Sequence, residues 1–119
     1  MRVVAAGVDP ADWKIRAGGM GTDRELQCPL GLEVSGVITA VGAEVEYFAV
    51  GDAVLGPVVE GYGEFAESTV VRADAAGVKP DMLSFTDAAA LPVAGATAYD
   101  AVHQLDQTDG RSTLLGSAL

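Results

Sequence analysis

The chain is poor in cysteine and histidine. Of its 119 residues, one is cysteine, Cys28, and one is histidine, His103. A single cysteine can build neither a disulfide framework nor a four-cysteine structural zinc site. We therefore expect Cys28 and His103 to be ordinary packing or surface residues.

Positive charge is also scarce. Seven Lys and Arg residues stand against 17 Asp and Glu residues, which gives a net charge of −10. A protein of that charge repels phosphate backbones and anionic head groups, so neither nucleic acid nor a membrane is an expected partner.

Long apolar runs and a basic leader are missing too. The longest stretch without a charged residue, 88–99, is interrupted by Pro92 and Gly95, whereas a membrane-spanning helix needs about 20 apolar residues. The chain opens on Met1-Arg2 and runs straight into apolar residues, without the features of a signal peptide. We predict a cytoplasmic protein with one hydrophobic core.

Glycine and branched apolar residues are abundant between residues 31 and 54. Gly31, Gly36, Gly42 and Gly51 separate short runs rich in Val and Ile. This pattern predicts two or three short strands joined by tight corners, as in a small curved barrel.

Two further strands are expected around this core. The apolar run 3–8 predicts a buried strand, and partial alternation over 64–71 predicts another. We expect the acidic side chains of the second strand, Glu64 and Glu67, to face water.

Two helical segments are expected as well. In the first, about 9–16, Asp9 can cap the helix and Asp12 lies in the first turn, where the helix dipole favours a negative charge. In the second, Ser84 followed by Asp87 resembles a capping box. Pro92 is expected to bend or restart this second helix, which continues to residue 105.

Three segments in the right order resemble the medium-chain dehydrogenase/reductase superfamily. Residues 5–14, 61–66 and 88–99 are similar to the AAGVNPADWK, GGYAEY and AAALPVAGLTAY segments of its zinc-independent, quinone-oxidoreductase-like members. The resemblance implies a mainly β fold with short helices, a partly open and incomplete GroES-like barrel. It covers nearly the whole chain.

The same resemblance implies a domain plan. The barrel core is expected at about 1–80, a helical connector at about 84–106, and the start of a Rossmann strand at about 112–116. Relatives carry a hairpin before Val3 and a Rossmann domain after Gly116, so the chain 1–119 is expected to be a catalytic-domain fragment.

The resemblance also argues against zinc. The zinc enzymes of the superfamily carry a G-H-E segment in which the histidine binds the metal, and here that segment is Gly31-Leu32-Glu33. Leucine has no lone pair to offer a metal. Asp9 stands in the place of a cysteine ligand, and Ala11 in the place of a proton-relay serine or threonine. We expect no metal site.

Three residues are candidates for the cofactor and substrate site by this resemblance. Asp9 takes the place of an asparagine near the nicotinamide and substrate, where a carboxylate can accept but not donate a hydrogen bond. Thr97 lies where the nicotinamide carboxamide would approach. Lys14 could place a positive charge near a substrate carbonyl, or it could simply be solvated.

Two further carboxylates correspond to residues that orient metal ligands in the zinc branch. These are Asp12 and Glu33. Without a metal they are expected to be structural, and to pair with Arg16 or with backbone donors.

The function implied is that of a zinc-independent, NADPH-dependent oxidoreductase. Its substrates would be quinones or other conjugated carbonyls, with hydride transfer from the nicotinamide. A homo-oligomer is expected for the complete enzyme. The alternative is a non-catalytic truncated barrel, or an interaction module without cofactor binding.

Overall fold

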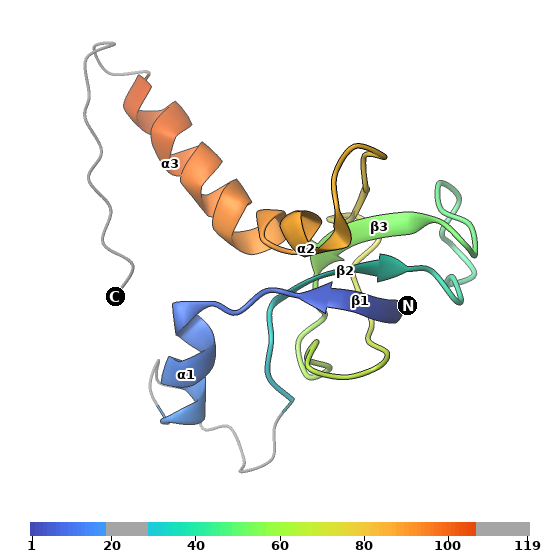
Figure 1. Ribbon diagram of the computed structural model, residues 1–119, viewed down its shortest axis with the longest axis horizontal. Coiled ribbons are helices and arrows are strands. Elements are labelled where there is room, and N and C mark those ends of the chain that lie inside the picture. Colours follow the sequence, from blue (N-terminus) through green and yellow to red (C-terminus); the bar gives the residue numbers. More distant parts are fainter. Residues whose placement is uncertain (19–28, 107–119) are drawn as a thin grey trace.

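A computed structural model of the protein describes residues 1–18 and 29–106 (Figure 1). The expectations for Cys28 and for a Rossmann strand at 112–116 fall outside these residues. The strands are β1 (Arg2–Ala6), β2 (Glu33–Val37), β3 (Ala53–Pro57) and β4 (Gly77–Val78). The helices are α1 (Pro10–Arg16), α2 (Phe85–Ala88), the π-helical turn η1 (Leu91–Gly95) and α3 (Ala96–Asp106).

The strands form one antiparallel sheet in the order β1-β2-β3-β4. Ala6 lies opposite Val34, and Glu33 lies opposite Pro57. The last residues of β1, the first of β2 and the last of β3 therefore lie at the same end of the sheet. The described part of the sheet does not close on itself. The expected fold class, mainly strands with short helices in a partly open GroES-like barrel, is confirmed.

Strand β2 is the centre of the core. Its first four residues are buried, among them Val34, and Val54 of the neighbouring β3 is also buried. A side chain at Gly36 would collide with the carbonyl oxygen of Arg2, so glycine lets β1 approach β2 closely. The buried Ser35 hydroxyl donates to the Phe85 carbonyl at 2.6 Å and fixes α2 against the sheet.

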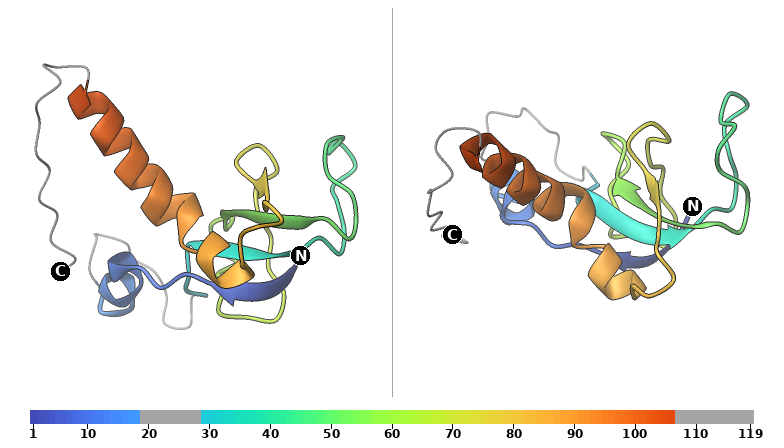
Figure 2. Two further views of the ribbon diagram at one scale, coloured as in Figure 1. Left: turned by 45° about the horizontal axis from the view of Figure 1, so that its top comes forward. Right: turned by 90° about the horizontal axis from the view of Figure 1, so that it is seen from above.

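The helices that follow the sheet begin as the sequence predicts. The Ser84 hydroxyl oxygen accepts a hydrogen bond from the Asp87 N–H at 3.0 Å, which caps α2. Pro92 lies in η1, between α2 and α3, and so marks the expected interruption. Helix α3 packs mainly against η1 and extends away from the sheet in each view (Figures 1 and 2).

The expected strand at 64–71 is wrong. This segment makes only isolated bridges, Arg2 with Ser68 and Val58 with Val71. The Thr69 hydroxyl donates to the Gly63 carbonyl. Glu67 is exposed as expected, but Glu64 is buried, with 1% of its surface exposed.

In the part of the chain described, no helix is both long enough and apolar enough to cross a membrane.

Candidate functional site

Four segments meet at the end of the sheet where β2 begins. The Gly7 N–H, just after β1, donates to the Glu33 carbonyl at 3.0 Å. The Val58 N–H, just after β3, donates to the Leu32 carbonyl at 2.9 Å. The start of η1 reaches the same end through Glu33. Backbone bonds therefore place Leu32 and Glu33 at the junction of these segments.

Helix α1 begins at this junction and brings two carboxyl groups to it. Asp9 is the N-cap residue, as predicted, and is half-buried. Asp12 is 4% exposed, and its Oδ2 atom accepts the Asp9 N–H at 2.8 Å. The expectation that Asp12 pairs with a backbone donor is confirmed.

Glu33 joins the sheet to η1. Its side chain is 2% exposed, and its Oε2 atom accepts the backbone N–H groups of Val93 at 2.8 Å and Ala94 at 3.2 Å. The expected pairing with backbone donors is therefore confirmed for Glu33 too. A Cβ atom at Gly7 would lie 2.6 Å from Glu33 Oε1, so the carboxylate occupies the space of a missing side chain.

Glu64 is the fourth carboxyl group, and the sequence interpretation missed it. Neither of its oxygens has a hydrogen-bond partner among the described residues. A Cβ atom at Gly31 would overlap Glu64 Cγ, and Gly31 has a φ of 107°, a backbone conformation that favours glycine. Glycine at position 31 thus makes room for the Glu64 side chain.

Burial and the repulsion between neighbouring negative charges raise the pKa values of two of these carboxyl groups. Burial raises the pKa of Asp9 to about 6, with smaller contributions from the negative charges of Glu33 and Asp12. Burial also raises the pKa of Glu64 to about 8. The nearby Leu32 N–H lowers the Glu64 pKa somewhat, although it makes no hydrogen bond to the Glu64 oxygens. The negative charges of Asp12, Glu33 and Asp9 raise it further.

The shift changes what Asp9 can do. As a carboxylate Asp9 can only accept hydrogen bonds, which is the state the sequence analysis considered. Below about pH 6 the carboxyl group is mostly protonated and can also donate.

A cavity of about 260 Å³ opens beside Leu32 at this end of the sheet. Its lining is mostly apolar or glycine and carries one acidic side chain; the residues are Pro29, Gly31, Leu32, Val58, Val59, Glu60, Gly61 and Gly63. Of these, Gly31 lies against the Glu64 side chain, and Gly63 directly precedes Glu64 in the chain. The cavity has room for a small molecule.

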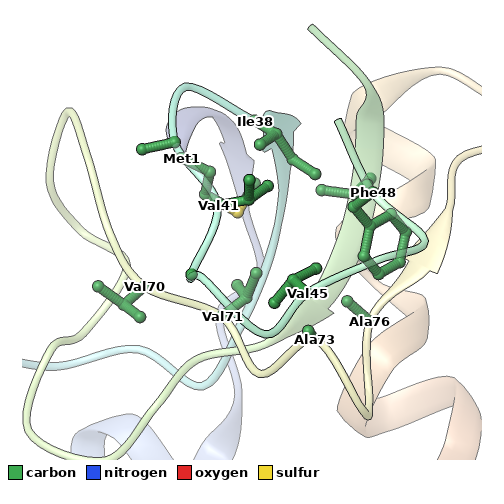
Figure 3. Close-up of a pocket in the computed structure, with 12 residues that line it drawn as sticks. Met1, Ile38, Val41, Val45, Phe48, Val70, Val71, Ala73 and Ala76 are labelled. Atoms are coloured by element: carbon green, nitrogen blue, oxygen red, sulfur yellow. The ribbon is translucent and has the colours of Figure 1, made fainter. Parts of the chain in front are cut away.

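A second cavity lies at the opposite end of the sheet, beyond Val37, and is about 120 Å³ (Figure 3). Side chains including Ile38, Val45 and Phe48 point into it, and its lining carries no charged residue. It offers packing surface but no group that could do chemistry.

The predicted site residues are not all brought together. Asp9 joins the buried carboxyl groups, whereas the half-buried Lys14 holds its ammonium 5.7 Å from the ring centroid of the neighbouring Trp13. Thr97 is exposed on α3, and its hydroxyl makes no hydrogen bond to a described residue. None of the three lines the cavity beside Leu32. Their roles stay predictions.

The residue types at the junction bear on whether it could hold zinc. Leu32 has no donor atom, and zinc sites take sulfur, imidazole nitrogen or carboxylate oxygen in tetrahedral groups. Within residues 1–18 and 29–106, no group of three or more His, Cys, Asp and Glu side chains is arranged to hold a metal ion.

Comparison with known proteins gives a family for the chain. Residues 1–81 match the model of the alcohol dehydrogenase GroES-like domain. The 2-methylene-furan-3-one reductase of Solanum lycopersicum is 38% identical over 127 residues, an alignment that covers 99% of this chain and 33% of that protein. The chloroplastic NADPH-dependent alkenal/one oxidoreductase of Arabidopsis thaliana is 35% identical over 123 residues, covering 97% and 32%.

A solved structure agrees with this assignment. The quinone oxidoreductase from Coxiella burnetii superposes with a TM-score of 0.77 at 33% identity, over 87% of this chain and 34% of that one. The chain therefore spans about a third of the length of the proteins it matches.

Proposed function

Because the chain belongs to the alcohol dehydrogenase GroES-like domain family, in the medium-chain dehydrogenase/reductase superfamily, we propose that it is the catalytic-domain part of a zinc-independent, NADPH-dependent oxidoreductase. Its substrates are quinones or other conjugated carbonyls. The relatives named as a quinone oxidoreductase and as alkenal and furanone reductases support this reaction class. Leu32 is the observation that supports independence of zinc, because this aliphatic side chain on the wall of the 260 Å³ cavity has no atom that could bind a metal.

The residues at the end of the sheet around Leu32 have distinct roles in this proposal. NADPH, when bound, supplies the hydride. Leu32, Pro29 and Val58 form an apolar wall that packs against the conjugated part of a substrate and excludes water from it. Asp9, at the start of α1, orients a polar group of the substrate or the nicotinamide.

Two residues outside the cavity are proposed to act on the same ligands. The exposed Thr97 hydroxyl, without a partner among the described residues, is available to the nicotinamide carboxamide. Lys14 offers a positive charge to a substrate carbonyl, although its present contact is with Trp13. The complete enzyme is proposed to be a cytoplasmic homo-oligomer.

The test is substrate discrimination in a protein that combines this chain with a nucleotide-binding domain. We expect NADPH oxidation with a quinone or an α,β-unsaturated ketone, and little with the matching saturated ketone. Reduction of the saturated ketone alone would contradict the proposed substrate class. Binding of neither NADPH nor substrate would support the alternative, a non-catalytic barrel.

A further inference from the structure

The carboxyl groups at the end of the sheet where β2 begins come from three separate segments. Asp9 and Asp12 belong to the start of α1, Glu33 to the start of β2, and Glu64 to the loop after β3. The charged groups that act on Glu64 are the carboxyl groups of Asp9, Asp12 and Glu33. No lysine, arginine or histidine of the described residues balances them at this point.

Backbone N–H groups donate to two of the neighbouring carboxyl groups. Glu33 accepts two N–H groups from η1, and Asp12 accepts one from Asp9. Hydrogen bonds to a carboxylate favour its ionised form. Glu64 accepts no such bond from a described residue.

Glu64 is in the opposite position. It is 1% exposed, and both of its oxygens lack a hydrogen-bond partner in the described part of the chain. An isolated carboxylate is expensive to bury, and such a group usually becomes neutral instead. Glycine at position 31 leaves the space that the side chain fills, so the local backbone is adapted to a buried Glu64.

We propose that Glu64 is a proton-binding site of the fold: folding takes up a proton from solvent onto the Glu64 carboxylate, and loss of that proton weakens the junction of α1, β2 and the loop after β3. The site binds a proton because the carboxyl group is buried and neither of its oxygens has a hydrogen-bond partner among the described residues. This inference goes beyond the proposed function and does not rest on it.

The direction of the pH effect follows from the shift of Glu64. Its pKa is raised from an ordinary 4.5 to about 8 in the folded chain, so the unfolded chain binds fewer protons between these values. The stabilising contribution is complete below about pH 4.5 and is lost as the pH rises through about 8. Asp9, with a pKa raised to about 6, contributes only to the lower part of this window.

Between pH 6 and pH 8 the change in stability therefore comes mainly from Glu64. Urea unfolding of the 119-residue chain at the two pH values measures this change. The unfolding equilibrium constant should rise roughly fiftyfold from pH 6 to pH 8. In Glu64→Gln this rise should be lost. The matched control is Glu67→Gln, an exposed glutamate three residues away, which should behave as the natural chain.

Three outcomes would overturn the proposal. One is a Glu64→Gln variant that keeps the full rise. Another is a natural chain without any rise. The third is stabilisation at pH 8 by added Ca²⁺ or Zn²⁺ that is absent in Glu64→Gln, which would make a metal cation the ligand. If Glu64→Gln fails to fold, carboxyl NMR of the natural chain decides, because the Glu64 signal must titrate near pH 8 rather than near 4.5.

Discussion

Glycines make the space for the buried carboxyl groups at this site. A Cβ atom at Gly7 would lie 2.6 Å from Glu33 Oε1, and Glu33 cannot move away without losing its two hydrogen bonds to η1. Gly77 of β4, in contrast, has no atom within 4 Å of the added Cβ and no unusual φ. The two positions form a matched pair.

We predict that Gly7→Ala lowers the free energy of unfolding by about 1–3 kcal/mol, the usual cost of overpacking. Gly77→Ala should change it by less than about 0.5 kcal/mol. Urea unfolding at one pH measures both. Equal stability of the two variants would mean that the Glu33 carboxylate is not fixed as described.

Thr97 gives a second prediction at this scale. Thr97→Val keeps the shape of the side chain and removes the hydroxyl, which should cost about 0.5–1.5 kcal/mol of hydrogen bonding to the nicotinamide carboxamide. NADPH affinity or turnover of the completed enzyme should then fall by up to roughly tenfold.

Thr97→Ser is the control, since it restores a hydroxyl and should recover most of that affinity. If Thr97→Val changes the melting temperature alone and leaves the kinetics with NADPH unchanged, Thr97 does not belong to the cofactor site.

The sequence predicted the site residues unevenly. Local sequence placed Asp9 at the helix cap. For Asp12 and Glu33 the family resemblance left Arg16 or backbone donors open, and the partners are backbone N–H groups, 3 positions away for Asp12 and 60 positions away for Glu33. Glu64 could not be found in this way. Its burial depends on Gly31, more than 30 positions earlier in the chain, and no local periodicity reports such a contact.

At the scale of elements, α2 depends on its cap. It has four residues, Phe85–Ala88, and so cannot be stable by its own hydrogen bonds. Two contacts hold it: the Ser84 cap on Asp87 N–H and the Ser35 hydroxyl on the Phe85 carbonyl. The Lys79 ammonium also lies 4.8 Å from the Phe85 ring centroid.

Ser84→Ala should therefore lower the free energy of unfolding by about 1 kcal/mol, the typical value for the loss of a cap. Thr86→Ala, on the exposed side of the same helix, is the control and should leave stability unchanged or slightly higher. Thermal unfolding compares the two. A Ser84→Ala variant as stable as Thr86→Ala would show that the cap contributes nothing to α2.

The elements with clear end signals were the ones correctly predicted. Helix α1 begins after Asp9 with Pro10, and the interruption at Pro92 separates α2 from α3. The segment 64–71 alternates only partly, and long-range bonds determine its path instead. The Met1 ammonium donates to the Thr69 carbonyl at 2.8 Å, and the Val3 N–H donates to the Glu67 carbonyl at 2.9 Å.

In the whole molecule, the cavity lies at one end of the sheet, and helices α1 and α3 expose apolar side chains. Helix α3 extends from η1 (Figure 2). On this helix, Tyr99 and Val102 are 73% and 54% exposed. On α1, Trp13 is 56% exposed. The sequence predicted the barrel and the helical connector because the motifs extend over both. The domain boundaries themselves remain a prediction.

We propose that the end of the sheet around Leu32 supports hydride transfer without a metal. The most direct measurement is NADPH oxidation with a quinone, by this chain joined to a nucleotide-binding domain, before and after exhaustive chelation with the metal content determined in parallel. We expect an unchanged rate, with far less than one zinc per chain. A rate that falls to background on chelation and returns when zinc is added would contradict it.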